Sequence, residues 1–189
     1  RLPEEVERLG VRSALVLCTP GQREAAEEVA RQLGERCTGI YDQAVMHVPI
    51  ETAEDARLVA AKLRADCCVA VGGGSTIGLG KAIALTSALP ILAVPTTFAG
   101  SEMTPIYGLT EAGVKRTGRD ARVLPRTVIY DPTLTVTLPA AIAGPSGMNA
   151  IAHAVKALYA QDANPVTSLM AEESIRALAD TLPRVVRDP

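Results

Sequence analysis

The sequence predicts an α/β fold: a parallel sheet with helices on both faces, Rossmann-like, followed by the start of an all-helical domain. Short, continuously apolar runs alternate with amphipathic helical patterns over the first part of the chain. Runs without polar alternation are typical of strands that helices cover on both faces of a sheet. Near the end of the chain only helical periodicity remains, which predicts the change to an all-helical region.

The first half of the chain repeats the order strand, turn, helix. Residues 13–17 predict a strand, and the helix after Pro20-Gly21 has apolar residues at helical spacing: Ala26, Val29, Ala30 and Leu33. Residues 39–41 and 45–48 read as extended. The stretch from Thr52 to Asp55 then resembles a capping box before the next helix. Further strands are predicted at 67–71 and 90–95, with a helix between them that reaches about residue 87.

Two domains are predicted from the change in pattern further along. Residues 106–110 and 127–130 read as extended, with a polar, solvent-facing connection over 113–120. After Leu138-Pro139, apolar residues fall on helical faces only. We therefore expect a dinucleotide-binding α/β domain over residues 1–135 and a partial helical domain over 136–189.

Composition excludes several classes of partner. The 189 residues carry a net charge of -2, with 19 Lys+Arg against 21 Asp+Glu and no dense basic run, so nucleic acid is not an expected partner. The chain has no Trp and only one Phe, which argues against a base-stacking surface. It lacks both a signal-peptide pattern and the roughly 18 apolar residues of a membrane helix. We expect no membrane association and a cytoplasmic location.

The four cysteines fit a reducing compartment. Cys67 and Cys68 are adjacent in an apolar run, while Cys18 and Cys37 stand alone, so no C-x-x-C pair exists. A catalytic thiol needs a nearby cation or base, and none is adjacent in the sequence. We therefore interpret these cysteines as reduced core residues.

A glycine-rich loop is the first candidate binding site. Gly72, Gly73, Gly74 and Ser75 lie between a buried strand and a helix, where backbone N–H groups can bind a phosphate. The pattern is neither the G-x-G-x-x-G fingerprint nor a P-loop, because Ile77 stands at the third glycine position and Ala82 follows Gly80-Lys81. A tight turn would explain two glycines, but three glycines and a serine favour a phosphate-binding site.

A second small-residue loop follows the next strand. It contains Thr96, Thr97, Ser101 and Thr104. Taken alone, such a loop could simply satisfy its own backbone. Next to the glycine loop, at the end of a neighbouring strand, it favours completion of a dinucleotide site.

Asn149 and His153 are spaced four residues apart, on one face of a predicted helix. The spacing lets two side chains reach one substrate group or metal. His47 is the only other histidine, so a multi-histidine metal site cannot be completed. A structural role for His153 stays open on spacing alone.

The ordered motifs resemble the iron-containing alcohol dehydrogenase and dehydroquinate synthase-like superfamily, most closely its maleylacetate reductase branch. The resemblance rests on four segments, which are Gly72 to Lys81, Pro95 to Pro105, Asp131-Pro132 and Gly147 to Ala154. They occur in the family's order and span almost the whole chain. Family members run to about twice this length and have further histidines, so this chain looks truncated.

The resemblance implies an enzyme that reduces maleylacetate to 3-oxoadipate with NADH or NADPH, in the breakdown of aromatic compounds. It also implies His153 as catalytic residue, a small dicarboxylate as substrate and a homodimer as assembly. The implied cofactor-binding residues are those of the two loops together with one lysine: Gly72, Gly73, Gly74, Ser75, Thr96, Thr97, Thr104 and Lys115. A solvated Lys115 is an equally simple interpretation.

Two departures from the metal-dependent members suggest that no metal is needed. Those members have Asp where this chain has Gly78 and Asn149, and an amide is a poor substitute for a carboxylate as a ligand of a divalent cation. Three alternatives remain open: an iron- or zinc-dependent alcohol dehydrogenase, a nucleotide-binding module without catalysis, and a fragment that another chain must complete. The sequence does not discriminate between NADH and NADPH.

Overall fold

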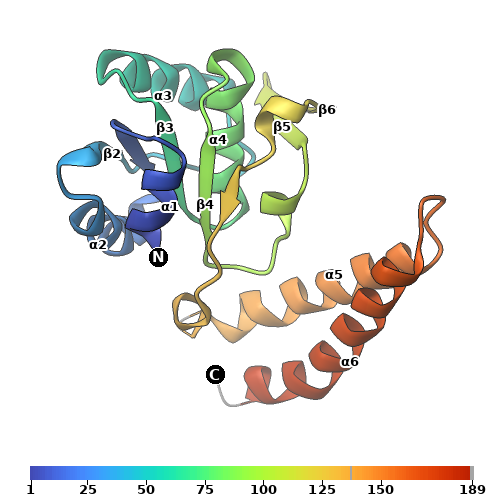
Figure 1. The fold of residues 1–189 in the computed structure, drawn as a ribbon. Helices are drawn as coiled ribbons and strands as arrows, with labels where there is room; N and C mark the ends of the chain where they lie inside the picture. The colour runs from blue at the N-terminus through green and yellow to red at the C-terminus, as the bar shows by residue number, and fades with distance from the viewer. Residues whose placement is uncertain (137, 188–189) are drawn as a thin grey trace. The chain divides into compact units, whose positions relative to one another are not determined.

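The computed structural model describes residues 1–136 and 138–187. The chain folds into two compact units. The first consists of residues 1–96 and 100–131, and the second of residues 97–99 and 132–189. Figure 1 shows the sheet in the first unit and a pair of long helices in the second.

A five-stranded parallel sheet forms the centre of the first unit, with the strand order β2-β1-β3-β4-β7. The strands are β1 (Ala14–Leu17), β2 (Cys37–Tyr41), β3 (Cys67–Gly72), β4 (Ile91–Pro95) and β7 (Thr127–Val128). Every residue of β1, β3 and β4 is buried. The predicted parallel sheet is therefore confirmed, and burial on both faces explains the continuously apolar runs.

Helices cover both faces of this sheet (Figure 1). On one face, α3 (Ile50–Lys62) and α4 (Gly74–Ser87) pack on the strands. Their shared core contains Leu15, Leu17, Ala56, Cys68 and Ile83, among others. Successive strand residues point to opposite faces, so the alternate residues of β1 and β3 face the other layer, where α2 (Arg23–Leu33) contacts β1 and β2 and is joined by α1 (Leu2–Arg8).

A hairpin replaces the predicted solvent-facing connection over 113–120. β5 (Ile106–Glu111) and β6 (Val114–Arg119) pair as an antiparallel ribbon outside the main sheet. Its two-residue turn, Ala112 and Gly113, has φ of 49° and 76°, as the primed hairpin turns require. The predicted solvent exposure is confirmed, because β6 is mostly exposed. The strand itself was missed because this polar segment lacks the apolar pattern of a core strand.

The prediction that residues 45–48 are extended was also wrong. These residues form a turn in which His47 and Val48 have φ of 66° and 44°, and the Val48 amide donates to the carbonyl of Val45 at 3.3 Å. The capping-box interpretation fails as well, because α3 begins at Ile50, with Pro49 at the N-cap position and no side-chain cap.

Short 3₁₀ turns connect the elements of the chain: η1 (Pro20–Gln22), η2 (Gly34–Arg36), η3 (Ser101–Met103), η4 (Ala121–Val123) and η5 (Pro132–Thr135). η1 and η3 matter most for function. η1 follows β1 directly, and η3 lies in the small-residue loop after β4.

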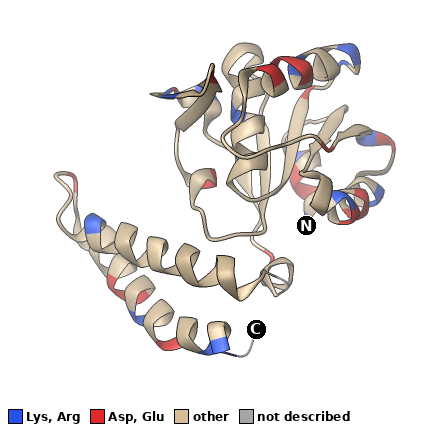
Figure 2. Ribbon diagram, turned by 180° about the vertical axis from the view of Figure 1, so that it is seen from behind, with Lys and Arg blue, Asp and Glu red and all other residues tan. Residues whose placement is uncertain are grey.

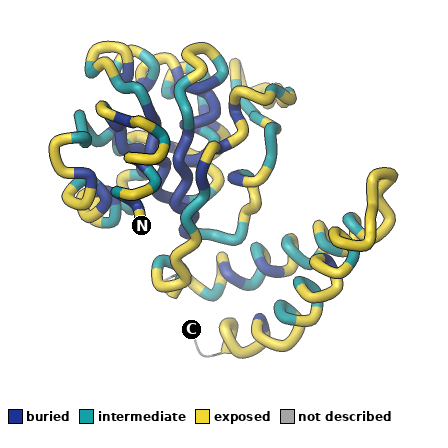
Figure 3. The backbone as a smooth tube through the Cα atoms, in the orientation of Figure 1, coloured by how far each residue is buried: buried dark blue, intermediate teal, exposed yellow. Residues whose placement is uncertain are grey.

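The second unit is a helical hairpin of α5 (Ala140–Leu158) and α6 (Pro165–Arg187). The helices approach closely at Gly147, where a Cβ would lie 2.6 Å from Cδ1 of Leu182. Figure 3 shows that little of this pair is buried, and its buried residues are Ala143, Gly147, Ala171 and Leu182. Within residues 1–136 and 138–187, no helix has the combination of length and apolar character needed to cross a bilayer.

Candidate functional site

The carboxyl ends of β1, β3 and β4 lie next to one another where the order of the strands reverses. β1 lies between β2 and β3, so the chain moves outward to β2 and then returns past β1 to β3. In open parallel sheets such a switch point leaves a crevice at the carboxyl ends of the strands, where ligands bind. Here the segments that follow β1, β3 and β4 lie at this position.

The glycine loop presents the free N-terminus of α4 at this edge. Gly73 is the N-cap of α4, Gly74 is its first residue, and no side chain caps the helix. The first turn contains no acidic residue. Uncapped N–H groups carry a partial positive charge and bind anions. The loop can therefore bind a phosphate group.

The surroundings of residue 72 require a glycine. Its φ is +152°, and a Cβ there would lie 2.4 Å from Oγ1 of Thr76 and 2.5 Å from Oε1 of Gln22. Both oxygens thus occupy the space of a side chain at residue 72. Oγ1 of Thr76 is buried and has no hydrogen-bond partner among the described residues. A bound ligand or water could satisfy this hydroxyl, so the loop fits the dinucleotide that the family resemblance implies.

Gln22 is a site residue that the motif analysis missed. Its side chain connects the ends of β1 and β4: Oγ1 of Thr19 donates to Oε1 of Gln22 at 3.2 Å, and Nε2 of Gln22 donates to Oγ1 of Thr96 at 2.6 Å. The amide of Thr96 also donates to the carbonyl of Gly72 at 3.2 Å. Gln22 and Thr96 are 74 residues apart in the sequence, so no local pattern could reveal their contact.

Lys81 is the second missed residue, and it is fully buried. Its Nζ donates to the carbonyls of Ser101, Thr104 and Ile106 at 2.6, 2.8 and 2.7 Å. Three carbonyls match the three protons of an ammonium group. Burial lowers the pKa of Lys81 to about 8, although the charge of Glu102 acts in the opposite direction. Lys81 therefore holds the loop after β4 and is not directed at a phosphate.

Thr104 belongs to the same network. Its hydroxyl lies 3.3 Å from Nζ of Lys81 and donates to the carbonyl of Ser101 at 3.3 Å. The side chain thus serves its own loop. Thr97 is part of the short stretch 97–99 that groups with the second unit, whereas Thr96 belongs to the first.

Glu102 is a buried carboxylate beside Lys81, with 4% of its surface exposed. Oε1 accepts a hydrogen bond from the hydroxyl of Tyr130 at 2.9 Å, and Oε2 has no partner in the described part of the chain. Burial and this carboxylate raise the pKa of Tyr130 to about 12, so the phenol stays protonated and remains a donor.

Lys115 lies on β6 and is exposed. It pairs with Thr110 across the hairpin, and a Cβ at Gly108 would lie 3.0 Å from its Cε. Its stem therefore covers Gly108. Its role in cofactor binding stays a prediction.

His153 and Asn149 lie on α5, in the second unit, and both are exposed. Their four-residue spacing places them on one side of the helix. No group of three or more His, Cys, Asp or Glu residues that could hold a metal occurs in residues 1–136 and 138–187. These residues supply at most one good ligand and one weak ligand, and so do not form a metal site by themselves.

Gly78 explains one departure from the metal-dependent members. A Cβ at this position would lie 2.8 Å from Cγ2 of Val48, and Val48 is buried. The turn that holds Val48 is fixed by Thr110, whose amide donates to the carbonyl of Val48 at 3.0 Å. An aspartate at residue 78 would therefore collide with Val48.

The interior of the candidate site carries almost no charge. Between residues 67 and 101 the only charged side chain is that of Lys81, and Figure 2 shows that most charges lie on the outer helices and loops. The first acid after this stretch is Glu102, which lies in the loop after β4 and not in the first turn of α4, so the partial positive charge of the α4 N-terminus is not cancelled by an acid in its own turn.

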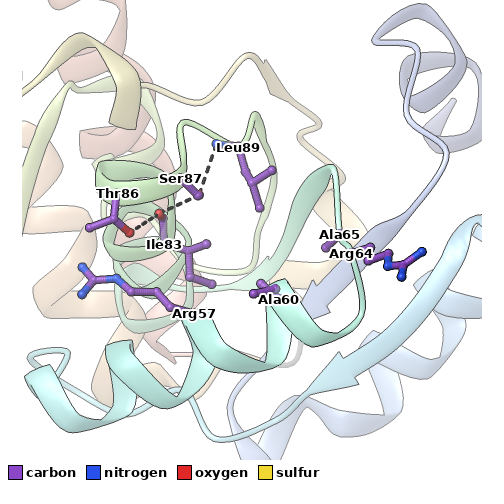
Figure 4. A pocket seen from close by; sticks show the side chains of 9 residues that line it. Arg57, Ala60, Arg64, Ala65, Ile83, Thr86, Ser87 and Leu89 are labelled. Carbon is purple, nitrogen blue, oxygen red and sulfur yellow. Dashed lines mark hydrogen bonds between the residues drawn. The ribbon is translucent and has the colours of Figure 1, made fainter.

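The pocket in Figure 4 lies toward the amino ends of the strands, opposite the candidate site. It is lined by the C-terminal parts of α3 and α4, including Ala60 and Ile83, and by residues that follow these helices, including Arg64 and Leu89. Arg57 at its rim is engaged, since its Nε and Nη2 donate to the carbonyl of Ala82 at 3.1 and 2.8 Å. Because α4 starts at the carboxyl end of β3, its C-terminus lies far from the glycine loop. This pocket is separate from the candidate site.

Comparison with known proteins places the whole chain in one family. Residues 1–132 match the family described as iron-containing alcohol dehydrogenase, and residues 143–189 match the Fe-containing alcohol dehydrogenase family, C-terminal. The chain is 62% identical to a maleylacetate reductase from Burkholderia cepacia and 58% identical to one from Sphingobium indicum. Each comparison covers 100% of this chain and 53% of the relative, so the chain spans about half the length of these curated relatives.

Solved structures agree with this assignment. The crystal structure of maleylacetate reductase from Agrobacterium tumefaciens is 50% identical with a TM-score of 0.95, over 100% of this chain and 54% of that one. An iron-containing alcohol dehydrogenase from Corynebacterium glutamicum is 49% identical with a TM-score of 0.91, over 100% of this chain and 52% of that one. The chain therefore belongs to the iron-containing alcohol dehydrogenase family.

Proposed function

We propose that this chain carries the dinucleotide site of an NAD(P)H-dependent maleylacetate reductase. The observation that carries the proposal is the uncapped, acid-free N-terminus of α4 at the switch point of the sheet, next to the unpartnered Thr76 hydroxyl. The substrate is inferred from relatives named maleylacetate reductase, with identities from 52% to 62%. The product would be 3-oxoadipate.

The residues of the first unit would bind and orient the cofactor. The N–H groups of Gly73, Gly74 and Ser75 would hold the pyrophosphate, and Gly72 leaves room for its approach. Thr96, Thr97, Thr104 and Lys115 are the proposed contacts on the ribose and nicotinamide side. When bound, NADH or NADPH would supply a hydride to one carbon of the substrate's carbon-carbon double bond.

His153 is the proposed catalytic residue. Reduction of the double bond adds one hydride and one proton to adjacent carbons, so the site needs a proton donor or a group that binds a substrate oxygen. An imidazole can donate a proton or a hydrogen bond to a substrate oxygen, and His153 is exposed on α5. A homodimer and a cytoplasmic location belong to the same proposal, by analogy with the family.

We further propose that catalysis needs no metal. The support is the donor set, because Asn149 supplies an amide in place of a carboxylate and Val48 occupies the space that an acidic side chain at Gly78 would need. An iron or zinc ion that is bound stoichiometrically, and whose removal abolishes reductase activity, would favour a metal-dependent alcohol dehydrogenase, the second candidate suggested by the family name.

The test is an NADH titration, followed by fluorescence, of the wild-type chain and the Gly74→Asp variant. The aspartate should lower NADH affinity at least about tenfold, because its carboxylate would repel the pyrophosphate. The melting temperature should be unchanged or higher, because an acid in the first turn stabilises a helix. Gln32→Glu, on the exposed surface of α2, controls for the added charge.

His153→Ala separates catalysis from cofactor binding in the same assay. The variant should keep wild-type NADH affinity and melting temperature but lose maleylacetate reduction by about a hundredfold or more. Unchanged NADH affinity in Gly74→Asp would refute the phosphate site. NADH binding without any turnover in the wild-type chain would favour a nucleotide-binding module.

A further inference from the structure

The Gln22 side chain forms the middle of a hydrogen-bonded chain across the switch point. It accepts from the hydroxyl of Thr19 at 3.2 Å and donates to Oγ1 of Thr96 at 2.6 Å. Thr19 follows β1 and Thr96 follows β4, so the amide group of Gln22 reaches across the end of β3 between them. Its carbonyl oxygen fills the space above Gly72.

The direction of these hydrogen bonds determines what Thr96 can offer to a ligand. A hydroxyl has one proton to donate and two lone pairs that accept. Because Oγ1 of Thr96 accepts the proton of the Gln22 amide, the hydroxyl proton of Thr96 remains available. The hydrogen bond found for this hydroxyl among residues 1–136 and 138–187 is the one that it accepts from Gln22, so its proton is available to a bound ligand or water. Thr96 is only 7% exposed, so an unused donor there is unfavourable without a partner.

Thr96 lies directly beside the glycine loop, since its amide donates to the carbonyl of Gly72 at 3.2 Å. A phosphate on the N-terminus of α4 presents oxygens that only accept hydrogen bonds. The Thr96 proton and the free N–H groups of α4 would then serve the same anion. Successive hydrogen bonds of one direction also strengthen one another.

We propose that Gln22 is a positioning residue, which makes the Thr96 hydroxyl a donor to a pyrophosphate oxygen of the dinucleotide. The inference rests on the proposed function. It moves Thr96 from the ribose and nicotinamide side to the pyrophosphate, and it adds a residue outside the glycine loop. Gln22 acts through Thr96. With the amide group reversed, the Thr96 proton would be consumed by Oε1 of Gln22 and the ligand would meet no donor.

The experiment is a double-mutant cycle for NADH affinity in the full 189-residue chain, with Gln22→Met, Thr96→Val and the double variant. Methionine keeps the length of the side chain and removes both hydrogen bonds. Gln22→Met should weaken NADH binding about tenfold in the wild-type background and less than about twofold in the Thr96→Val background. Thr96→Ser should restore the affinity that Thr96→Val loses.

A purely structural role would give a different result. Gln22→Met would then lower the melting temperature, and its effect on NADH affinity would be the same in both backgrounds. Gln22→Glu is a second variant, which keeps a polar group between the two threonines. Its carboxylate accepts from both hydroxyls, so NADH affinity should fall further than in Gln22→Met. Gln32→Met, on the exposed surface of α2, is the matched control.

The outcomes separate this inference from the proposed function. NADH binding that is sensitive to Gly74→Asp but additive for Gln22 and Thr96 overturns the role of Gln22 alone. A Gln22→Glu variant that binds NADH as well as wild type overturns it as well. A wild-type chain that binds no NADH overturns both proposals.

Discussion

Gly78 is a residue whose identity follows from one tertiary contact. Within α4, a glycine is unfavourable by about 1 kcal/mol relative to alanine. It is retained next to Val48, whose Cγ2 would lie 2.8 Å from a Cβ at residue 78. Val48 itself has φ of 44°, which is strained for a β-branched residue. The strain and the missing side chain together let the 45–48 turn pack closely on α4.

Gly78→Ala should therefore destabilise the protein, in spite of the better helix propensity of alanine. Overpacking costs about 1–3 kcal/mol, so we expect a net loss of about 1 kcal/mol in the free energy of unfolding, measured by urea denaturation. Combination with Val48→Ala should remove the collision and restore the propensity gain.

Gly80→Ala is the matched control in the same helix. A Cβ there would meet Cγ2 of Ile91 at 3.5 Å and Cδ1 of Leu17 at 3.6 Å, which are ordinary contacts. This variant should be more stable than wild type by about 0.5–1 kcal/mol. If Gly78→Ala gains as much stability as Gly80→Ala, the proposed steric conflict with Val48 does not exist.

At the scale of single elements, β1 is completely buried and is followed by a cysteine whose thiol can titrate. Cys18 follows the strand directly and has no exposed surface. Burial, helped by the negative charge of Asp42, raises the pKa of its thiol from 9.0 to about 11. All four cysteines are free, and Cys67 in β3 has a pKa raised by burial to about 12. Cys18, Cys67 and Cys68 are core residues, as predicted, whereas Cys37 is partly exposed.

The raised pKa of Cys18 predicts a loss of stability in alkali. Below pH 9 the thiol is protonated in both folded and unfolded chains. Between about pH 9 and 11 only the unfolded chain loses the proton, so the free energy of unfolding falls with pH, by up to about 2–3 kcal/mol from this residue. Urea denaturation at several pH values should show a smaller fall for Cys18→Ala.

Cys37→Ala, which leaves the Cys18 thiol in place, should keep the steeper fall of the wild type. Cys67 and the other buried acids contribute equally to both variants, so the comparison isolates Cys18. Equal slopes for Cys18→Ala and wild type would contradict the assignment of this pH dependence to β1.

At the scale of the whole molecule, the two units differ in how completely they bury their apolar residues. The first unit has continuous cores on the sheet, such as the cluster around Leu15, Leu17 and Ile83. The second unit buries few residues, and Met148, Leu169 and Met170 of its helices are more than half exposed. Cofactor binding is proposed for the well-packed unit, and the proposed catalytic residue, His153, lies in the other.

We therefore expect the 189-residue chain to bind NADH better than it catalyses. With maleylacetate and NADH, turnover should be below about 1 per second, the lower end of the usual enzyme range. The loss of NADH absorbance measures it, and the fluorescence titration gives the affinity in parallel. Turnover within the usual range would show that the helices present here are sufficient for catalysis.

The sequence by itself determined the order of the elements and the family. Continuous apolar runs and glycines are local signals. They predicted β1, β3 and β4 to within one residue at each end, the end of α4, and the helical character of the second unit without the bounds of its helices. They failed for β6, which is exposed and polar, and for the 45–48 turn, where Val48 is buried beside Gly78 of α4 while Val45 and Met46 are exposed.

Only the tertiary structure decided which side chains meet. Gln22 contacts Thr96, Val48 fills the space beside Gly78, and Lys81 holds the loop of Thr104. Each contact joins residues that are far apart in the chain and have no pattern in common. The physical reason is that hydrogen-bond direction and close packing depend on how the strand ends and helices are brought together, which local periodicity does not encode.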